Sequence, residues 1–139
     1  MKRMIGCLLI ALAGLLVRDA VGCDCAPPPP PKTALAQSAA VFQAKVVKIE
    51  EVGFEKKVTL QVERWWKGGE AATIIVSTSK SGASCGYGFQ KDVKYLVYAY
   101  AEKGNPVLQV SLCSRTRTME VAGKTGDLKD LGEGKAPTR

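Results

Sequence analysis

The sequence predicts a small, mainly β protein: a closed barrel of five strands with a short N-terminal helix and a C-terminal helix, held by disulfides. Two observations favour this fold class. Five runs rich in β-branched and aromatic residues follow one another between residues 41 and 113, with glycine-containing turns between them. Four cysteines follow residue 22, the even number expected of a disulfide framework. Closure is favoured over an open sheet because it hides the strand edges.

Residues 1–22 have the features of a secretory signal peptide. Lys2 and Arg3 form a basic start, residues 5–17 are almost wholly apolar, and small residues precede Cys23. The apolar run is shorter than the ~20 residues that a membrane-spanning helix needs, which disfavours a retained anchor. We expect cleavage after Gly22 and secretion, to an extracellular or periplasmic space. The alternative is lipoprotein processing with Cys23 lipidated, although Ala20 stands where a large aliphatic residue is usual.

Cleavage would leave 117 residues with four cysteines and a net charge of +5, from 17 basic and 12 acidic side chains. That length suits one domain with a real core, which we place at residues 23–132. We expect residues 133–139 to form a flexible tail.

The elements are predicted in chain order. Pro27 to Pro31 favour a stiff polyproline II segment, either a rigid strap or a ligand for an aromatic groove. Thr33 is a candidate N-cap for a helix over residues 34–39. A second helix over residues 119–131 is weakened by two internal glycines. The five expected strands are residues 41–50, 58–65, 73–78, 95–100 and 107–113.

Two tryptophans, Trp65 and Trp66, end the second of these strands. Neighbouring residues of a strand face opposite ways, so we expect one ring in the core and the other packed at the surface. The pair is therefore not predicted to be a ligand platform.

The cysteines restrict the covalent framework. Four cysteines allow three pairings, but a Cys23–Cys25 bridge would close a ring too small for disulfide geometry. Two pairings between these cysteines and Cys85 and Cys113 remain open, of which Cys23–Cys85 with Cys25–Cys113 is the simpler. A four-cysteine zinc site and a redox dithiol are the alternatives, but both usually have a Cys-x-x-Cys spacing that is missing here.

Composition excludes several functions. The sequence has no histidine, so neither a Ser-His-Asp nor a Cys-His catalytic arrangement can form, and no histidine can bind a metal. We expect the protein not to be an enzyme and to need no cofactor. The basic residues are scattered without aromatic interleaving, which indicates a solvated surface, with weak polyanion binding as the minority reading and no specific nucleic-acid binding.

Three short motifs resemble the netrin-like module, and in particular the N-terminal domain of the tissue inhibitors of metalloproteinases. They are Cys23-x-Cys25 followed by Ala26-Pro27, then Cys85-Gly86-Tyr87, then Leu112-Cys113-Ser114. The resemblance covers residues 23–131. It implies a five-stranded OB-type barrel with flanking helices and the disulfides Cys23–Cys85 and Cys25–Cys113.

The resemblance also implies a mechanism. In that family the α-amino nitrogen and carbonyl oxygen of the first cysteine, here Cys23, chelate the zinc of a metalloprotease and displace the water that the protease needs. The side chain of residue 24 enters the adjacent pocket, and Cys25, Ala26, Pro27 and the loop of Ala83, Ser84 and Cys85 flank it. The only metal involved is the partner's zinc.

One residue departs from the family pattern. Asp24 stands where the family inhibitors carry a small hydroxyl residue. A carboxylate must lose hydration to enter an apolar pocket, so we expect weak binding to proteases with such pockets. The expected function is a secreted, monomeric metalloprotease inhibitor of the tissue-inhibitor type. The alternatives are a non-inhibitory extracellular binding module for proteins or polyanions, and a thiol-redox protein.

Overall fold

The computed structural model describes residues 22–138, so the predicted signal peptide lies outside the described residues except for Gly22. Five strands form a ring, in the order β1 (Ala40–Val52), β2 (Glu55–Lys67), β3 (Thr73–Ser79), β5 (Asn105–Gln109) and β4 (Lys94–Glu102), and β4 pairs back onto β1. All neighbours are antiparallel except β3 and β5. A two-residue strand, β6 (Arg117–Thr118), extends the sheet beside β4. The fold is therefore mainly β, as predicted.

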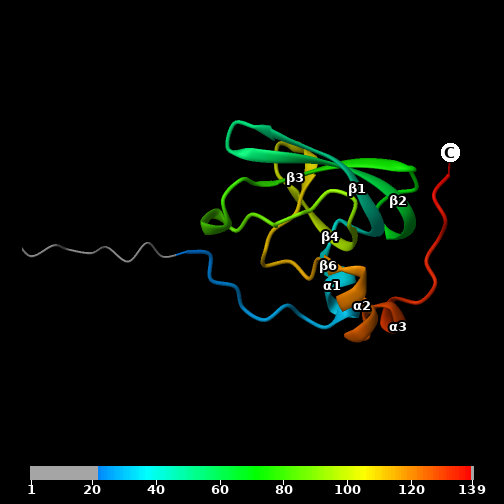
Figure 1. Ribbon diagram of the computed structural model, residues 1–139. Helices are drawn as coiled ribbons and strands as arrows, with labels where there is room; N and C mark the ends of the chain where they lie inside the picture. Colours follow the sequence, from blue (N-terminus) through cyan, green and yellow to red (C-terminus); the bar gives the residue numbers. More distant parts are fainter. Residues whose placement is uncertain (1–21, 139) are drawn as a thin grey trace, which may run out of the picture.

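Three short helices lie together on one side of the sheet (Figure 1). They are α1 (Pro31–Gln37), α2 (Met119–Lys124) and α3 (Asp127–Leu131). The N-terminal segment, residues 22–30, has no regular secondary structure and runs past this layer to enter α1. No helix of the described residues is long and apolar enough to cross a membrane.

Strand β4 separates two apolar clusters because its side chains alternate between them. Tyr95 and Val97 belong to the larger cluster, which gathers buried side chains from β1, β2, β3 and β4. Leu96 and Tyr98 point the other way and pack with Ala34 of α1 and Ala122 of α2. Burial on both faces explains why β4 is an unbroken apolar run in the sequence.

Several predicted boundaries are corrected. The first helix begins at Pro31 rather than after Thr33, because proline at the first helical position has a suitable φ and needs no N–H partner. The fifth predicted strand ends at Gln109, and residues 110–116 form a loop before β6. The second predicted helix divides into α2 and α3 at Gly126, whose φ of 77° ends regular helical geometry.

Residues 133–138, which the sequence predicts to be a flexible tail, make backbone hydrogen bonds to the domain. Lys135 exchanges two backbone hydrogen bonds with Trp65, of 2.7 and 2.8 Å, and Thr138 N donates to the Glu70 carbonyl oxygen at 2.7 Å. These bonds hold the tail against the end of β2 because that edge has unpaired backbone groups. Trp65 is buried against Phe42, whereas Trp66 is half-buried and donates to the Gly132 carbonyl oxygen.

Candidate functional site

The N-terminal segment carries two cysteines on one side and an aspartate on the other. Side chains two residues apart in an extended chain point the same way, and Cys23 and Cys25 are both half-buried against the domain. Asp24 between them is exposed, as are Ala26 and Pro27. This arrangement leaves the outer face of the segment open to a partner.

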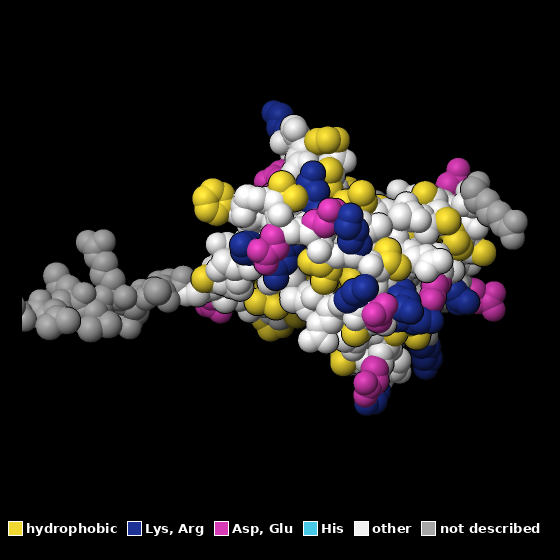
Figure 2. Space-filling model, turned by 45° about the horizontal axis from the view of Figure 1, so that its top comes forward, with side chains coloured by type: hydrophobic (Ala, Val, Ile, Leu, Met, Phe, Trp, Pro, Cys, Tyr) yellow, Lys and Arg dark blue, Asp and Glu magenta, His cyan; other side chains and the backbone are white. Residues whose placement is uncertain are grey.

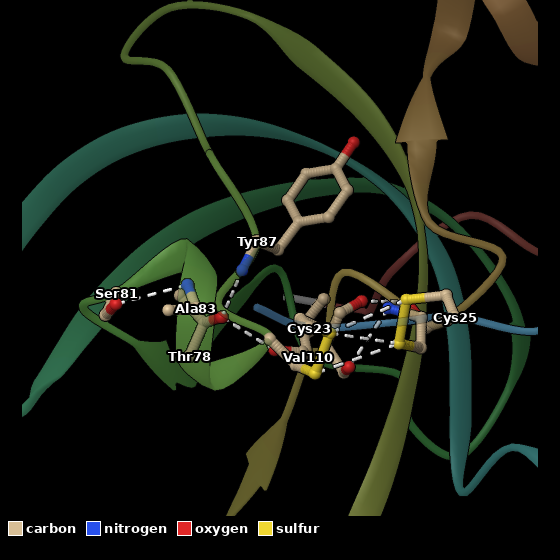
Figure 3. Close-up of a disulfide and its surroundings, with 11 residues drawn as sticks. Cys23, Cys25, Thr78, Ser81, Ala83, Tyr87 and Val110 are labelled. Atoms are coloured by element: carbon tan, nitrogen blue, oxygen red, sulfur yellow. Dashed lines mark hydrogen bonds between the residues drawn. A yellow bond between two sulfur atoms is a disulfide. The ribbon is translucent and has the colours of Figure 1, made fainter. Parts of the chain in front are cut away.

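Two disulfides attach this segment to the domain. Cys23 is bonded to Cys85 and Cys25 to Cys113, with Cα atoms 5.0 and 5.1 Å apart. This is the pairing that the family resemblance implied. Figure 3 shows Cys23 and Cys25 close to one another, to the side of the loop that carries Ala83. The cysteines are therefore in the oxidised state, without thiolates to bind a metal.

The loop that contains Cys85 has a backbone shape that its sequence enforces. Residues Gly82–Ser84 form a single 3-10 turn, and the Ser81 hydroxyl accepts a hydrogen bond from Ala83 N. Cys85 itself has a left-handed backbone with φ of 62°. Gly86 follows because a Cβ atom there would lie 2.0 Å from the Ser79 carbonyl oxygen. The backbone can turn back this tightly only at glycine.

A buried threonine joins this loop to strand β3. The Thr78 hydroxyl donates to the Val110 carbonyl oxygen and accepts from Tyr87 N, both at 2.7 Å (Figure 3). The Tyr87 ring packs against Phe89 and Tyr95. Burial, with the neighbouring Tyr95 phenol, raises the pKa of Tyr87 to about 12, so this phenol stays neutral at physiological pH.

Backbone bonds place Cys113 next to the Cys85 loop. Leu112 N donates to the Cys85 carbonyl oxygen at 2.8 Å, and Gly86 forms a β-bridge with Ser111. Cys113 N donates to the Ser111 hydroxyl at 3.0 Å. The fold thus positions Cys85 and Cys113 independently of their disulfide partners, Cys23 and Cys25.

The other end of the N-terminal segment is held without a covalent bond. Arg115 donates to the Pro29 carbonyl oxygen at 3.0 Å. Its guanidinium also forms a two-pronged pair with Asp127, through Nε to Oδ1 at 2.7 Å and Nη2 to Oδ2 at 2.9 Å. Pro31, the next anchor, is buried at the start of α1. The segment is therefore fixed at both ends.

Asp127 is fully buried and has four polar neighbours. Besides Arg115, it accepts hydrogen bonds from Tyr98 Oη at 3.1 Å and from Thr125 Oγ1 at 2.6 Å, while Arg117 Nη1 lies 3.7 Å from Oδ2. Burial alone would raise the pKa of Asp127, but hydrogen bonds from Arg115 and Thr125 and the two arginine charges outweigh it and lower the pKa. The carboxylate is thus ionised in the folded protein.

The predicted contact residues lie in two neighbouring segments, residues 22–27 and 82–85, which together we call the ridge. Ala83 and Ser84 are exposed, like Asp24, Ala26 and Pro27. The Cys23–Cys85 disulfide joins the two parts.

Sequence reasoning missed the neighbour of this ridge. A shallow groove of about 250 Å³ is lined by Ser84 and Cys85 together with Phe54 and Tyr100. Phe54 follows the Gly53 turn between β1 and β2 and is 92% exposed. A phenylalanine next to a turn glycine could have indicated an aromatic side chain at the surface, but only the fold places it near Cys85. Sequence reasoning also missed Arg115 and Asp127, which are 12 residues apart and belong to no local motif.

The surface charges do not gather by sign on the face that Figure 2 shows. Lysine and arginine side chains there alternate with aspartate and glutamate. Ion pairs among the described residues include Lys94 with Glu63 at 2.7 Å and Lys80 with Glu51 at 2.6 Å. This face therefore offers no continuous basic track for a polyanion.

No family model matches the chain, and no curated protein matches it.

Proposed function

We propose that this protein is a secreted metalloprotease inhibitor of the tissue-inhibitor type, with a netrin-like OB-type barrel as its scaffold. Removal of residues 1–22 would expose the α-amino group of Cys23, which would bind the zinc of the partner protease together with the Cys23 carbonyl oxygen. The observation that carries this proposal is the ridge, where disulfides fix the Cys23 backbone at the surface beside the Cys85 loop.

The zinc chemistry suits a terminal cysteine. The catalytic zinc of a metalloprotease keeps one position open for water or substrate. An α-amino group has an ordinary pKa near ~8, so a part of it is neutral at physiological pH, and metal binding displaces the remaining proton. Within the described part of the chain, neither the backbone nitrogen nor the carbonyl oxygen of Cys23 has a hydrogen-bond partner. Both atoms are therefore available to a metal.

The fixed backbone favours binding. A flexible terminus would lose conformational entropy on entering a protease cleft, whereas a segment held at both ends has lost it already. Two residues of the same short segment are held: Cys25 by its disulfide to Cys113, and Pro29 by the hydrogen bond that its carbonyl oxygen accepts from Arg115. In the complex, Asp24, Ala26 and Pro27 would contact the protease, with the loop of Ala83, Ser84 and Cys85 beside them.

The test compares two forms of one protein against a panel of zinc endopeptidases. The form that begins at Cys23 should inhibit at least one of them. A form with one alanine ahead of Cys23 should not, because the amine becomes an amide, which is a far poorer zinc ligand. Both forms must show the same circular dichroism and the same disulfides, so that only the terminus differs. Equal inhibition by both forms would exclude chelation through the amine.

A second candidate function is a non-inhibitory extracellular binding module. The groove beside the ridge favours it, because Phe54 and Tyr100 offer exposed aromatic surface to a protein partner. Failure of both forms to inhibit any protease in the panel would favour this function.

A further inference from the structure

The sulfurs of the two disulfides lie close to one another, and three of them form a compact group. Cys23 Sγ lies 3.4 Å from Cys113 Sγ and 3.7 Å from Cys25 Sγ, and neither pair is bonded. Cys85 Sγ lies 3.9 Å from Cys113 Sγ. The sulfurs of Cys23, Cys25 and Cys113 are all within 4.8 Å of one another.

These separations fit a metal–thiolate centre. Zinc binds cysteine sulfur at about 2.3 Å in a tetrahedron, so neighbouring sulfurs of such a site are about 3.8 Å apart. Three of the four non-bonded separations, 3.4, 3.7 and 3.9 Å, are already close to that edge length. The two bonded pairs would have to move apart, which breaking the disulfides permits, and Cys25 and Cys85, the fourth non-bonded pair, would have to adopt the same separation.

We propose that the reduced protein holds one zinc ion through the sulfurs of Cys23, Cys25, Cys85 and Cys113. A dithiol reductant supplies two electrons and two protons to each disulfide and is itself oxidised to a disulfide. The metal then displaces one proton from each of the four thiols, which leaves a zinc tetrathiolate of net charge −2 and releases four protons. The oxidised protein has no thiolate and binds no metal here, so occupancy follows the redox state.

The fold keeps the four ligands near one another without the disulfides. Cys85 and Cys113 stay adjacent through the bond from Leu112 N to the Cys85 carbonyl oxygen. Cys23 and Cys25 lie a few residues from Pro29, which Arg115 holds. The chain between Pro29 and Cys25 is proline-rich and stiff, which limits how far the first two cysteines can move away.

This site differs in kind from the proposed inhibitory contact. There the zinc belongs to the partner protease and the ligands are the backbone atoms of Cys23, whereas here the ligands are side-chain sulfurs. Zinc would hold the N-terminal segment on the domain whenever the disulfides are absent. Failure of one proposal leaves the other standing, because inhibition needs the oxidised protein and metal binding needs the reduced one.

The test uses the secreted product of the full chain, with cobalt(II) as the probe. The protein is reduced with a phosphine under argon and titrated with Co²⁺. We expect one cobalt per chain, with the intense sulfur-to-cobalt charge-transfer band and the visible bands of tetrahedral thiolate coordination. Zinc should abolish these bands by displacing cobalt. Protein that has not been reduced should show no bands.

Two variants identify the ligands. The Cys25→Ser, Cys113→Ser double variant should bind cobalt about 100-fold more weakly or worse, because two of four ligands are lost. Asp130→Ala should bind as the unsubstituted protein does, since Asp130 is exposed on α3 and no carboxylate is a ligand. Absence of charge-transfer bands in the reduced protein would overturn the proposal, as would unchanged bands in the double variant or weakened binding in Asp130→Ala. Near-ultraviolet circular dichroism follows folding: if reduction loosens the fold, metal must restore it.

Discussion

The N-terminal segment is held by two anchors of opposite character. At the cysteine end, two disulfides fix Cys23 and Cys25, and the side chains between and after them are exposed. At the proline end, Arg115 and the fully buried Asp127 fix the Pro29 carbonyl oxygen without any covalent bond. The same nine-residue stretch thus combines a covalent, exposed end with a non-covalent, buried one.

The difference shows what each kind of anchor allows. An ion pair exposed to water contributes little, so the Arg115–Asp127 anchor depends on burial: the Asp127 side chain is fully buried and that of Arg115 is 11% exposed. A disulfide holds equally well at the surface, so the Cys23 backbone can be fixed and still face a partner. The covalent anchor depends on redox state, whereas the ionic anchor depends on pH.

Removing one disulfide should have the largest effect. In Cys25→Ser, Cys113→Ser the bridge across 88 residues is lost, which costs about 4–5 kcal/mol of unfolding free energy in the chain-entropy model. Inhibition by the variant should weaken as well, because the terminus regains freedom. Urea unfolding and inhibition titrations measure the two effects. Unchanged inhibition would mean that the remaining Cys23–Cys85 bridge and the ionic anchor are sufficient.

Breaking the ionic anchor should cost nearly as much stability. Asp127→Ala leaves Arg115 without its partner and should lower the unfolding free energy by about 3–5 kcal/mol. Asp130→Ala is the matched control, since Asp130 is exposed on the same helix. Chemical unfolding measures both variants. If the two variants were equally stable, the buried pair would not be an anchor.

The ionic anchor should also make stability depend on pH. Folding lowers the pKa of Asp127 below its ordinary value near ~3.9, so the unfolded chain binds the proton first as pH falls. The stabilisation is complete above about pH 5 and is lost as pH falls through the lowered pKa. Unfolding curves of Asp127→Asn between about pH 7 and pH 3 should have a shallower slope than those of the unsubstituted protein. Identical slopes would contradict the assignment.

A single methyl group should disturb the exposed anchor. Gly86→Ala places a Cβ atom 2.0 Å from the Ser79 carbonyl oxygen and should cost about 1–3 kcal/mol. Gly82→Ala, where nothing lies within 4 Å of the added atom, should be nearly neutral. Thermal unfolding of the two variants distinguishes a strained loop from a tolerant one. Equal melting temperatures would show that the Cys85 loop can shift freely.

The smallest structural change should sharpen the function of the exposed end. Asp24→Thr should strengthen inhibition of proteases with apolar primary pockets about tenfold or more, since ~1.4 kcal/mol is tenfold and the carboxylate must otherwise be desolvated. Stability should stay unchanged because Asp24 is exposed. A protease with a basic pocket should show the reverse preference. If no protease responds to the change, residue 24 does not enter a pocket.

The two anchors also differ in how much of each could be predicted from the amino-acid sequence. Cysteine spacing limited the possible disulfides, and alternating apolar residues predicted the five strands to within a few residues. Arg115 and Asp127 carry no such pattern, because their partnership depends on the loop before β6, α3 and Pro29 meeting in space. Phe54 was overlooked for the same reason. The turn between β1 and β2 can be predicted from local sequence, but the residues across the groove from Phe54 come from other parts of the chain.

The chemical nature of the secreted N-terminus tests the central claim most directly. Intact mass and N-terminal sequencing of the product secreted by a cell that expresses the full chain should give residue 23 as the first residue, with a free α-amino group. Peptide mapping under non-reducing conditions should recover Cys23 with Cys85 and Cys25 with Cys113. An acylated or lipidated Cys23, or a chain that still begins upstream of it, would contradict the account, because such a terminus cannot chelate zinc through an amine.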